Sequence, residues 1–217
     1  MKLKLSFILF IAGISLLSLG TYRALTLPPI PIEYISENYR IVFFHVPAAI
    51  SSFISFIITF AYSIAYLKSE KPSRDAIAYS SAKYGFIMIT AALISGSIWA
   101  KVAWGSYWNW DPRETFVLIL WFAYAAYFGL RASIEDPLVK AKYSAVYAIF
   151  AFVTVPLSYL SSKLFFSLHP TTSELKFDFA RGSTLGMMMI AFIMLYLAFL
   201  LLESRIYEIE TGGDVHE

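Results

Sequence analysis

The sequence predicts an all-α membrane protein, a polytopic bundle of about six transmembrane helices. Of its 217 residues, 59% are hydrophobic and only 15% are charged, and the mean hydropathy is +0.65. Soluble domains of this length do not have such a composition. Apolar stretches near the roughly 20 residues needed to cross about 30 Å of hydrocarbon occur six times. They lie at about 5–25, 41–67, 84–103, 116–131, 144–164 and 182–202.

The first stretch follows a basic N-terminus and could be a secretory signal, but it lacks a small-x-small cleavage site, so we expect a helix that is retained. The second, as a helix of about 40 Å, would extend above the hydrocarbon at its start. The fourth is short, and Pro156 interrupts the fifth. No linker or repeat divides the chain. We therefore expect one domain over 1–217, with a polar tail at 205–217.

The distribution of Lys and Arg predicts how the bundle is oriented. The N-terminus and the even-numbered connections carry ten of these residues, Lys2, Lys4, Lys68, Lys71, Arg74, Lys83, Arg131, Lys140, Lys142 and Arg205. The odd-numbered connections carry seven, Arg23, Arg40, Lys101, Arg113, Lys163, Lys176 and Arg181. This split predicts both termini in the cytoplasm and the odd connections on the outer face of the cell membrane. The net charge of +2 gives no reason to expect nucleic acid as a partner.

The connection between the third and fourth stretches is unusually aromatic. It contains Trp104, Trp108 and Trp110, three of the five tryptophans, together with Gly105 and Tyr107. Loops are normally built from small and polar residues. These side chains could form the interfacial aromatic belt of a membrane protein, but belt residues are spread over both interfaces. Their density favours a platform for a large planar ligand.

The next residues fit the start of a helix. Asp111 suits the N-cap position, Pro112 the first helical position, and Glu114 the third, as in a capping box. A role as a cap therefore explains both carboxylates without any catalytic function.

Two of the three histidines fall on the same predicted face as the tryptophans. His45 lies at the outer end of the second stretch and His169 in the last outer connection, whereas His216 lies in the tail. Taken singly, His45 is explained by a helix end before Pro47 and His169 by a plain loop. Taken together in a chain without cysteine, they suggest a pair of imidazole ligands for a metal, and haem iron commonly uses such ligands.

Two histidines and an aromatic surface would suit a flat metal macrocycle. Arg40, Lys101, Arg113 and Arg181 are cations on the same face that could meet its propionates. Basic side chains that extend to the membrane interface are the alternative explanation for each of them.

These motifs resemble a known family. Trp104-Gly-Ser-Tyr-Trp108-Asn-Trp110-Asp-Pro-Arg-Glu-Thr115 resembles the tryptophan-rich "WWD" segment of haem-handling proteins in cytochrome c maturation. Arg40-Ile-Val-Phe-Phe-His45-Val-Pro-Ala-Ala49 resembles the first-histidine motif of its CcmC branch, and Leu168-His169-Pro170 resembles the second. The ending at 111–115 is also similar to the synthase subunit of the other maturation system, but the chain length favours CcmC.

The resemblance implies transient binding of haem b between two axial histidines on the outer face, followed by delivery to a haem chaperone of the CcmE type. It implies ABC transporter subunits, a small single-span CcmD-like protein and membrane lipid as partners. We expect no enzyme activity of its own, because the chain has no cysteine and no glycine-rich nucleotide loop. The resemblance assigns to the site His45, His169, Trp104, Gly105, Tyr107, Trp108, Trp110, Asp111, Arg40 and Arg113.

Two other classes of protein remain as alternatives. A haem-b membrane anchor of a respiratory enzyme would need histidines at mid-membrane depth, and the apolar stretches have none there. A transporter of an apolar solute would need broken helices and ionisable residues inside the membrane, whereas only Pro156 interrupts a stretch.

Overall fold

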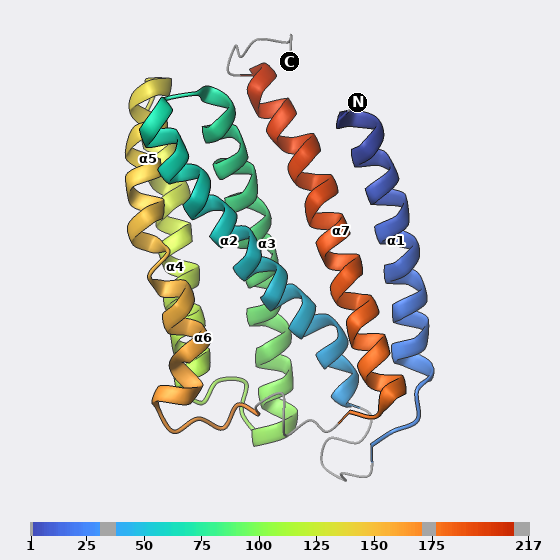
Figure 1. Cartoon of the computed structure of the whole chain (residues 1–217). Coiled ribbons are helices and arrows are strands. Elements are labelled where there is room, and N and C mark those ends of the chain that lie inside the picture. The colour runs from blue at the N-terminus through green and yellow to red at the C-terminus, as the bar shows by residue number, and fades with distance from the viewer. Residues whose placement is uncertain (1, 31–37, 171–176, 211–217) are drawn as a thin grey trace.

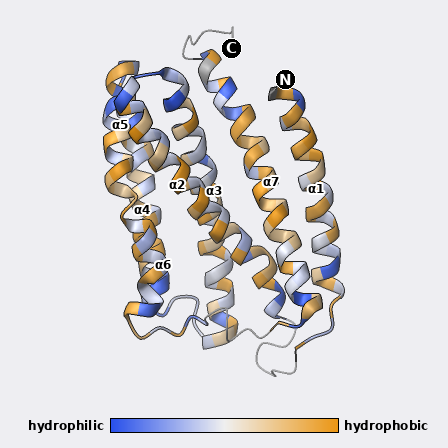
Figure 2. Cartoon of the chain, viewed as in Figure 1, coloured by the Kyte–Doolittle hydropathy of each residue, from blue (hydrophilic) through white to orange (hydrophobic). Residues whose placement is uncertain are grey.

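The computed structural model describes residues 2–30, 38–170 and 177–210, and all regular structure in these ranges is helical (Figure 1). Six segments are long and apolar enough to cross a membrane, which confirms the predicted bundle. The elements are α1 (Lys2–Thr26), the 3-10 helix η1 (Asn38–Ile41), α2 (Val42–Ser69), α3 (Pro72–Trp104), α4 (Pro112–Ser133), α5 (Pro137–Ala151), α6 (Thr154–Leu164) and α7 (Phe179–Glu210). Apolar residues cover most of their length (Figure 2).

Several helices extend beyond the apolar stretches that predicted them. α3 begins twelve residues before position 84 because its first turns bury Asp75, Ser80 and Ser81 inside the protein rather than in lipid. α7 continues to Glu210, so the start of the predicted tail is helical, while 211–217 and His216 lie outside the described residues.

The fifth predicted span consists of two helices, α5 and α6, with a break at Phe152 and Val153. Pro156 accounts for this break, because its ring has no N–H to donate and clashes with the carbonyl four residues earlier. On either side of the break, α5 packs on both α2 and α4, and α6 packs on α4. Pro47 also lies within a helix, in the second turn of α2.

The connections of the bundle are arranged as the number of spans requires. α1 begins and α7 ends at one end of the bundle (Figure 1). At the other end, α1, α3 and α6 end and α2, α4 and α7 begin. The Trp-rich connection and the His169 connection therefore lie at the same end as the start of α2.

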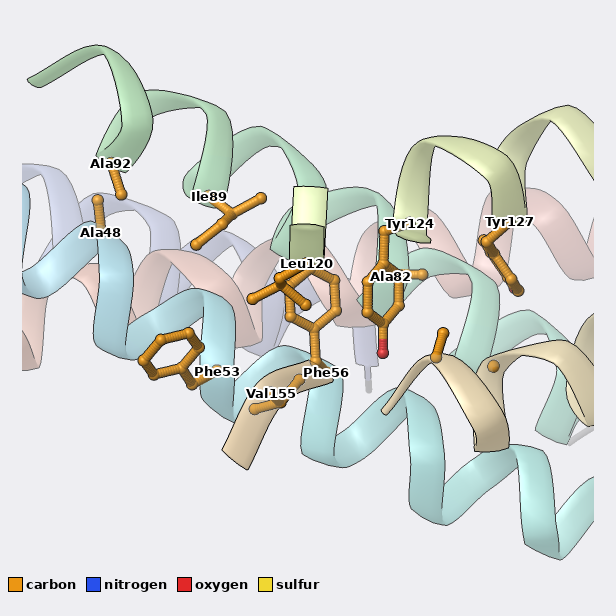
Figure 3. Packing of buried hydrophobic residues seen from close by; sticks show 12 residues of the cluster. Ala48, Phe53, Phe56, Ala82, Ile89, Ala92, Leu120, Tyr124, Tyr127 and Val155 are labelled. Atoms are coloured by element: carbon orange, nitrogen blue, oxygen red, sulfur yellow. The ribbon is translucent and has the colours of Figure 1, made fainter. Parts of the chain in front are cut away.

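Aromatic stacking and buried polar groups hold the central helices together. Phe56 of α2 stacks on Tyr124 of α4, with ring centroids 3.7 Å apart (Figure 3). Near the chain termini, Arg131 of α4 forms a buried bidentate pair with Asp75 of α3, at 2.8 and 2.9 Å, and donates to the hydroxyl of Tyr207 in α7. In lipid such polar contacts between helices supplement packing, since the hydrophobic effect no longer drives association.

Candidate functional site

A deep pocket opens where the odd-numbered connections meet. It lies between α2, α3, α4 and α6 and contains about 1550 Å³ of atom-free space, counting its open mouth. Ligand pockets usually have volumes of about 300–1,000 Å³. The cavity itself has a volume of about 280 Å³, close to the lower end of that range, and a large cofactor would extend into the open mouth. Its inner wall is apolar, formed by Val46, Ala49, Ile50, Phe53, Ile89, Ala92, Leu93 and Val117.

The two histidines predicted from the sequence to act together face each other across this pocket. The ring centroids of His45 and His169 are 6.5 Å apart and their planes are inclined by 40°. His45 comes from the first turns of α2, and His169 comes from the segment after α6, more than 120 residues later in the chain.

His45 is held by α3. Its Nδ1 lies 3.0 Å from the hydroxyl of Ser95. That hydroxyl donates its only proton to the carbonyl of Ala91 or Ala92, so it accepts from His45 Nδ1–H. The Nε2 atom of this tautomer carries a lone pair, as a metal ligand requires.

Gly96 allows the imidazole of His45 to lie close against α3. A Cβ atom at this position would be only 3.0 Å from His45 Cε1. Neither Ser95 nor Gly96 was singled out from the sequence. The run of small residues Ser95-Gly96-Ser97 in an apolar span was the available signal.

His169 is held in a different way, by hydrogen bonds at the Trp-rich connection. The carboxylate of Asp111 accepts from the hydroxyl of Ser167 at 2.9 Å and from the backbone N–H of Leu168 at 2.7 Å. The backbone N–H of His169 donates to Ser167 Oγ at 3.1 Å. His169 Nδ1 lies 3.0 Å from the carbonyl of Pro170, which can only accept, so this imidazole also carries its proton on Nδ1.

The predicted helix cap is present. Asp111 Oδ1 accepts from the backbone N–H of Arg113 at 2.8 Å, with Pro112 at the first helical position. Glu114 Oε2 accepts from the backbone N–H of Asn109 at 3.0 Å, so its side chain turns back as a capping box requires, although to a different residue. Gly105 ends α3 with φ +80°, a left-handed conformation that favours glycine.

The aromatic residues of the connection divide into two groups. Trp104 and Trp108 line the pocket, together with Trp99 of α3, which the sequence reading did not select. Trp110 is 73% exposed at φ +59°, and Tyr107 is also exposed. Trp108 and Trp110 meet edge to face at 88°, so their indoles do not share the single flat platform that the sequence suggested. With its left-handed backbone, Trp110 keeps its indole largely exposed and perpendicular to that of Trp108.

The predicted cations are distributed unevenly. Arg113 lines the pocket beside Lys163, and its Nη1 donates to the carbonyl of Tyr159 at 2.9 Å. Arg40 instead binds the carbonyls of Ala24 and Leu27 at the end of α1. Outside the pocket wall as well, Lys101 donates to Gly105 O, and Arg181 pairs with Asp178 and with the carbonyl of Pro28.

Comparison with known proteins identifies the family. Residues 1–169 match the family described as cytochrome C assembly protein. Heme exporter protein C of Bradyrhizobium diazoefficiens is 31% identical over 194 residues, 88% of this chain and 71% of that protein. A putative cytochrome c biosynthesis ccmC-like mitochondrial protein of Marchantia polymorpha is 26% identical over 197 residues, 90% of this chain and 82% of that protein.

A second group of relatives has a higher sequence identity to this chain, but over a shorter region. The cytochrome c biogenesis protein CcsA of a Synechococcus strain is 39% identical over 96 residues, 44% of this chain, and the match spans only 31% of that relative's length. These matches confirm the resemblance inferred from the Trp-rich and histidine motifs. The chain is thus an integral membrane protein that belongs to the cytochrome c assembly family.

Proposed function

We propose that this pocket binds haem b transiently, with His45 and His169 as the two axial ligands of the iron. The observation that carries this proposal is the separation of the two rings. Two metal–nitrogen bonds of about 2 Å each, plus about 1 Å from each nitrogen to its ring centre, would place coaxial imidazoles about 6 Å apart. The observed separation is 6.5 Å.

The remaining walls fit the two ends of an amphipathic macrocycle. Apolar side chains such as Phe53 and Ile89 line the depth of the pocket, and the indoles of Trp104 and Trp108 border its mouth. Arg113 and Lys163 are the cations on its wall and would meet the propionates by charge-assisted hydrogen bonds. Haem would then enter with its carboxylates toward the membrane surface and its apolar edge toward the bilayer centre.

We further propose that the protein presents this haem at the outer face of the cell membrane for delivery to a chaperone of the CcmE type. The name of the Bradyrhizobium relative supports a role in haem export during cytochrome c maturation. ABC transporter subunits and a small single-span CcmD-like protein would be the partners. Haem supplies the iron and the macrocycle, and the chain itself binds and orients them without enzyme activity.

The second candidate is a subunit of a cytochrome c synthase, which is supported by the local similarity to CcsA. Identity reaches 49% over 65 residues with another Synechococcus relative, although these cover only 21% of that protein. The two functions differ in the acceptor. Reconstitution with a CcmE-type chaperone and, separately, with an apocytochrome would show which of them receives haem.

The test of haem ligation is an optical spectrum of the protein purified in mild detergent. The wild type should show low-spin b-type haem, and His45→Gly and His169→Gly should each lose it. Added imidazole should restore it in part, because the missing ligand is a small diffusible group. His216→Ala is the matched control and should keep the wild-type spectrum. Unchanged haem content and spectrum in both glycine variants would contradict paired ligation.

A further inference from the structure

Asp111 belongs to one connection but makes most of its side-chain hydrogen bonds to another. It lies directly before α4, yet its carboxylate accepts from Ser167 and Leu168, 56 and 57 residues later in the chain. The residue is 5% exposed. Hydrogen bonds to a buried carboxylate are stronger than those between neutral groups, so this contact is a firm link between the two connections.

We propose that Asp111 is a positioning residue for His169, and that its carboxylate fixes the Ser167–Pro170 segment opposite His45. This inference deepens the haem site proposed above and rests on it for its consequence in haem binding. The link continues to the backbone of His169, because Ser167 Oγ, held by Asp111, accepts a hydrogen bond from the backbone N–H of His169.

His169 depends on such a link because its own segment has no helix to orient it. α6 ends at Leu164, and residues 165–170 have no regular secondary structure. Holding a side chain in such a segment costs conformational entropy, which must be offset by specific contacts. His45, by contrast, is placed by the backbone of α2. The position of the His169 ring relative to the His45 ring therefore depends on the contacts at Asp111.

Asp136 provides a matched control, because it caps a helix without joining two connections. It precedes Pro137 at the start of α5, as Asp111 precedes Pro112, and it caps that helix by accepting from the backbone N–H of Val139 at 2.8 Å. Asp136 is exposed, and in the described ranges no other connection donates to its side chain. Substitution at 136 therefore changes a cap alone.

Asp111→Asn separates the two roles within one residue. The amide oxygen can still accept the N–H of Arg113 and preserve the cap. The amide NH₂ group, in place of Oδ2, is a donor and would face the N–H of Leu168, so that hydrogen bond is lost. Ser167 can still donate to the amide oxygen, so the link is weakened rather than removed.

The first measurement follows the segment without using haem. The chain has no cysteine, so spin labels can be placed uniquely at Phe166, which is 90% exposed, and at Ile94 on the outside of α3. In Asp111→Asn and Ser167→Ala the distance distribution between the labels should broaden, whereas Asp136→Asn should leave it unchanged. A narrow, wild-type distribution in both of the first two variants would overturn the link.

The second measurement uses the spectrum of the haem-loaded protein. Asp111→Asn should weaken haem retention by about tenfold, the scale of one lost charged hydrogen bond. Exogenous imidazole should restore the low-spin spectrum, as it would in His169→Gly. A broadened distribution with an unchanged spectrum and unchanged retention would overturn the positioning role. If the wild type binds no haem, the proposed function fails, and the label distances alone decide whether Asp111 forms the link.

Discussion

Gly96→Ala is expected to displace His45 and weaken haem ligation. The added Cβ would lie 3.0 Å from His45 Cε1, whereas carbon atoms in contact prefer about 3.5–4.0 Å. The imidazole would therefore have to move by a few tenths of an ångström. Metal–ligand distances vary by only about 0.2 Å in well-formed sites, so this movement exceeds what ligation tolerates. The Ser95 hydroxyl, bonded to His45 Nδ1, restricts the ring from moving away freely.

The effect on stability has two opposing terms. Replacing glycine by alanine inside a helix stabilises it by roughly 0.5–1 kcal/mol, because the unfolded chain loses conformational freedom. Gly129 of α4 is the matched control, since a Cβ there would meet no atom within 4 Å. Gly129→Ala should thus increase the stability of the protein. Gly96→Ala should increase the stability by less, or decrease it.

Both variants are measured by thermal unfolding in detergent and by haem titration. We expect Gly96→Ala to lower haem affinity by about tenfold or more, which corresponds to about 1.4 kcal/mol, and Gly129→Ala to leave the affinity unchanged. Replacing Gly96 by valine should enlarge the loss. If Gly96→Ala matches Gly129→Ala in both stability and haem affinity, close packing at Gly96 does not place the ligand.

Two further predictions concern the Trp-rich connection. Trp108→Ala should lower the haem-to-protein ratio at unchanged protein abundance. The loss in the free energy of haem binding should be about 1–2 kcal/mol, by analogy with base stacking on aromatic rings. Trp110→Ala should have little effect on the ratio, because that indole is 73% exposed. A loss of protein abundance alone in both variants would instead identify an aromatic belt. A cysteine at Ser106 should react with an impermeant thiol reagent in intact cells, and one at Lys71 should not, since the split of basic residues predicts that the Trp-rich connection lies outside. The reverse labelling pattern would place that connection in the cytoplasm.

The features that the sequence could predict are those set by composition and local order. Apolar length identified the six spans, and because successive spans alternate in direction, alternate connections come to one end of the bundle. The Asp111-Pro112 pair predicted the start of α4 because capping depends on neighbouring residues only. The division into α5 and α6 was available in principle from Pro156, which cannot continue a regular helix.

The remaining features depend on how distant segments are aligned. The contact between Gly96 and His45 requires a particular register between α2 and α3, which no local pattern contains. The link from Asp111 to Ser167 joins residues 56 positions apart and requires α6 to end beside the start of α4. The outward direction of Trp110 follows from one left-handed residue, a conformation rare for a bulky aromatic side chain.

The two imidazoles of the pocket are thus supported unequally. His45 is part of α2, and moving it requires α2 to shift against α3 or the ring to leave Ser95. His169 lies in an irregular segment that the carboxylate of Asp111 joins to the start of α4 through Ser167 and Leu168. Local opening of a protein involves the elements with the fewest packed contacts and backbone hydrogen bonds. If the pocket binds and releases haem as proposed, we expect it to open on the side of His169, which lies in an irregular segment, while His45 keeps its position on α2.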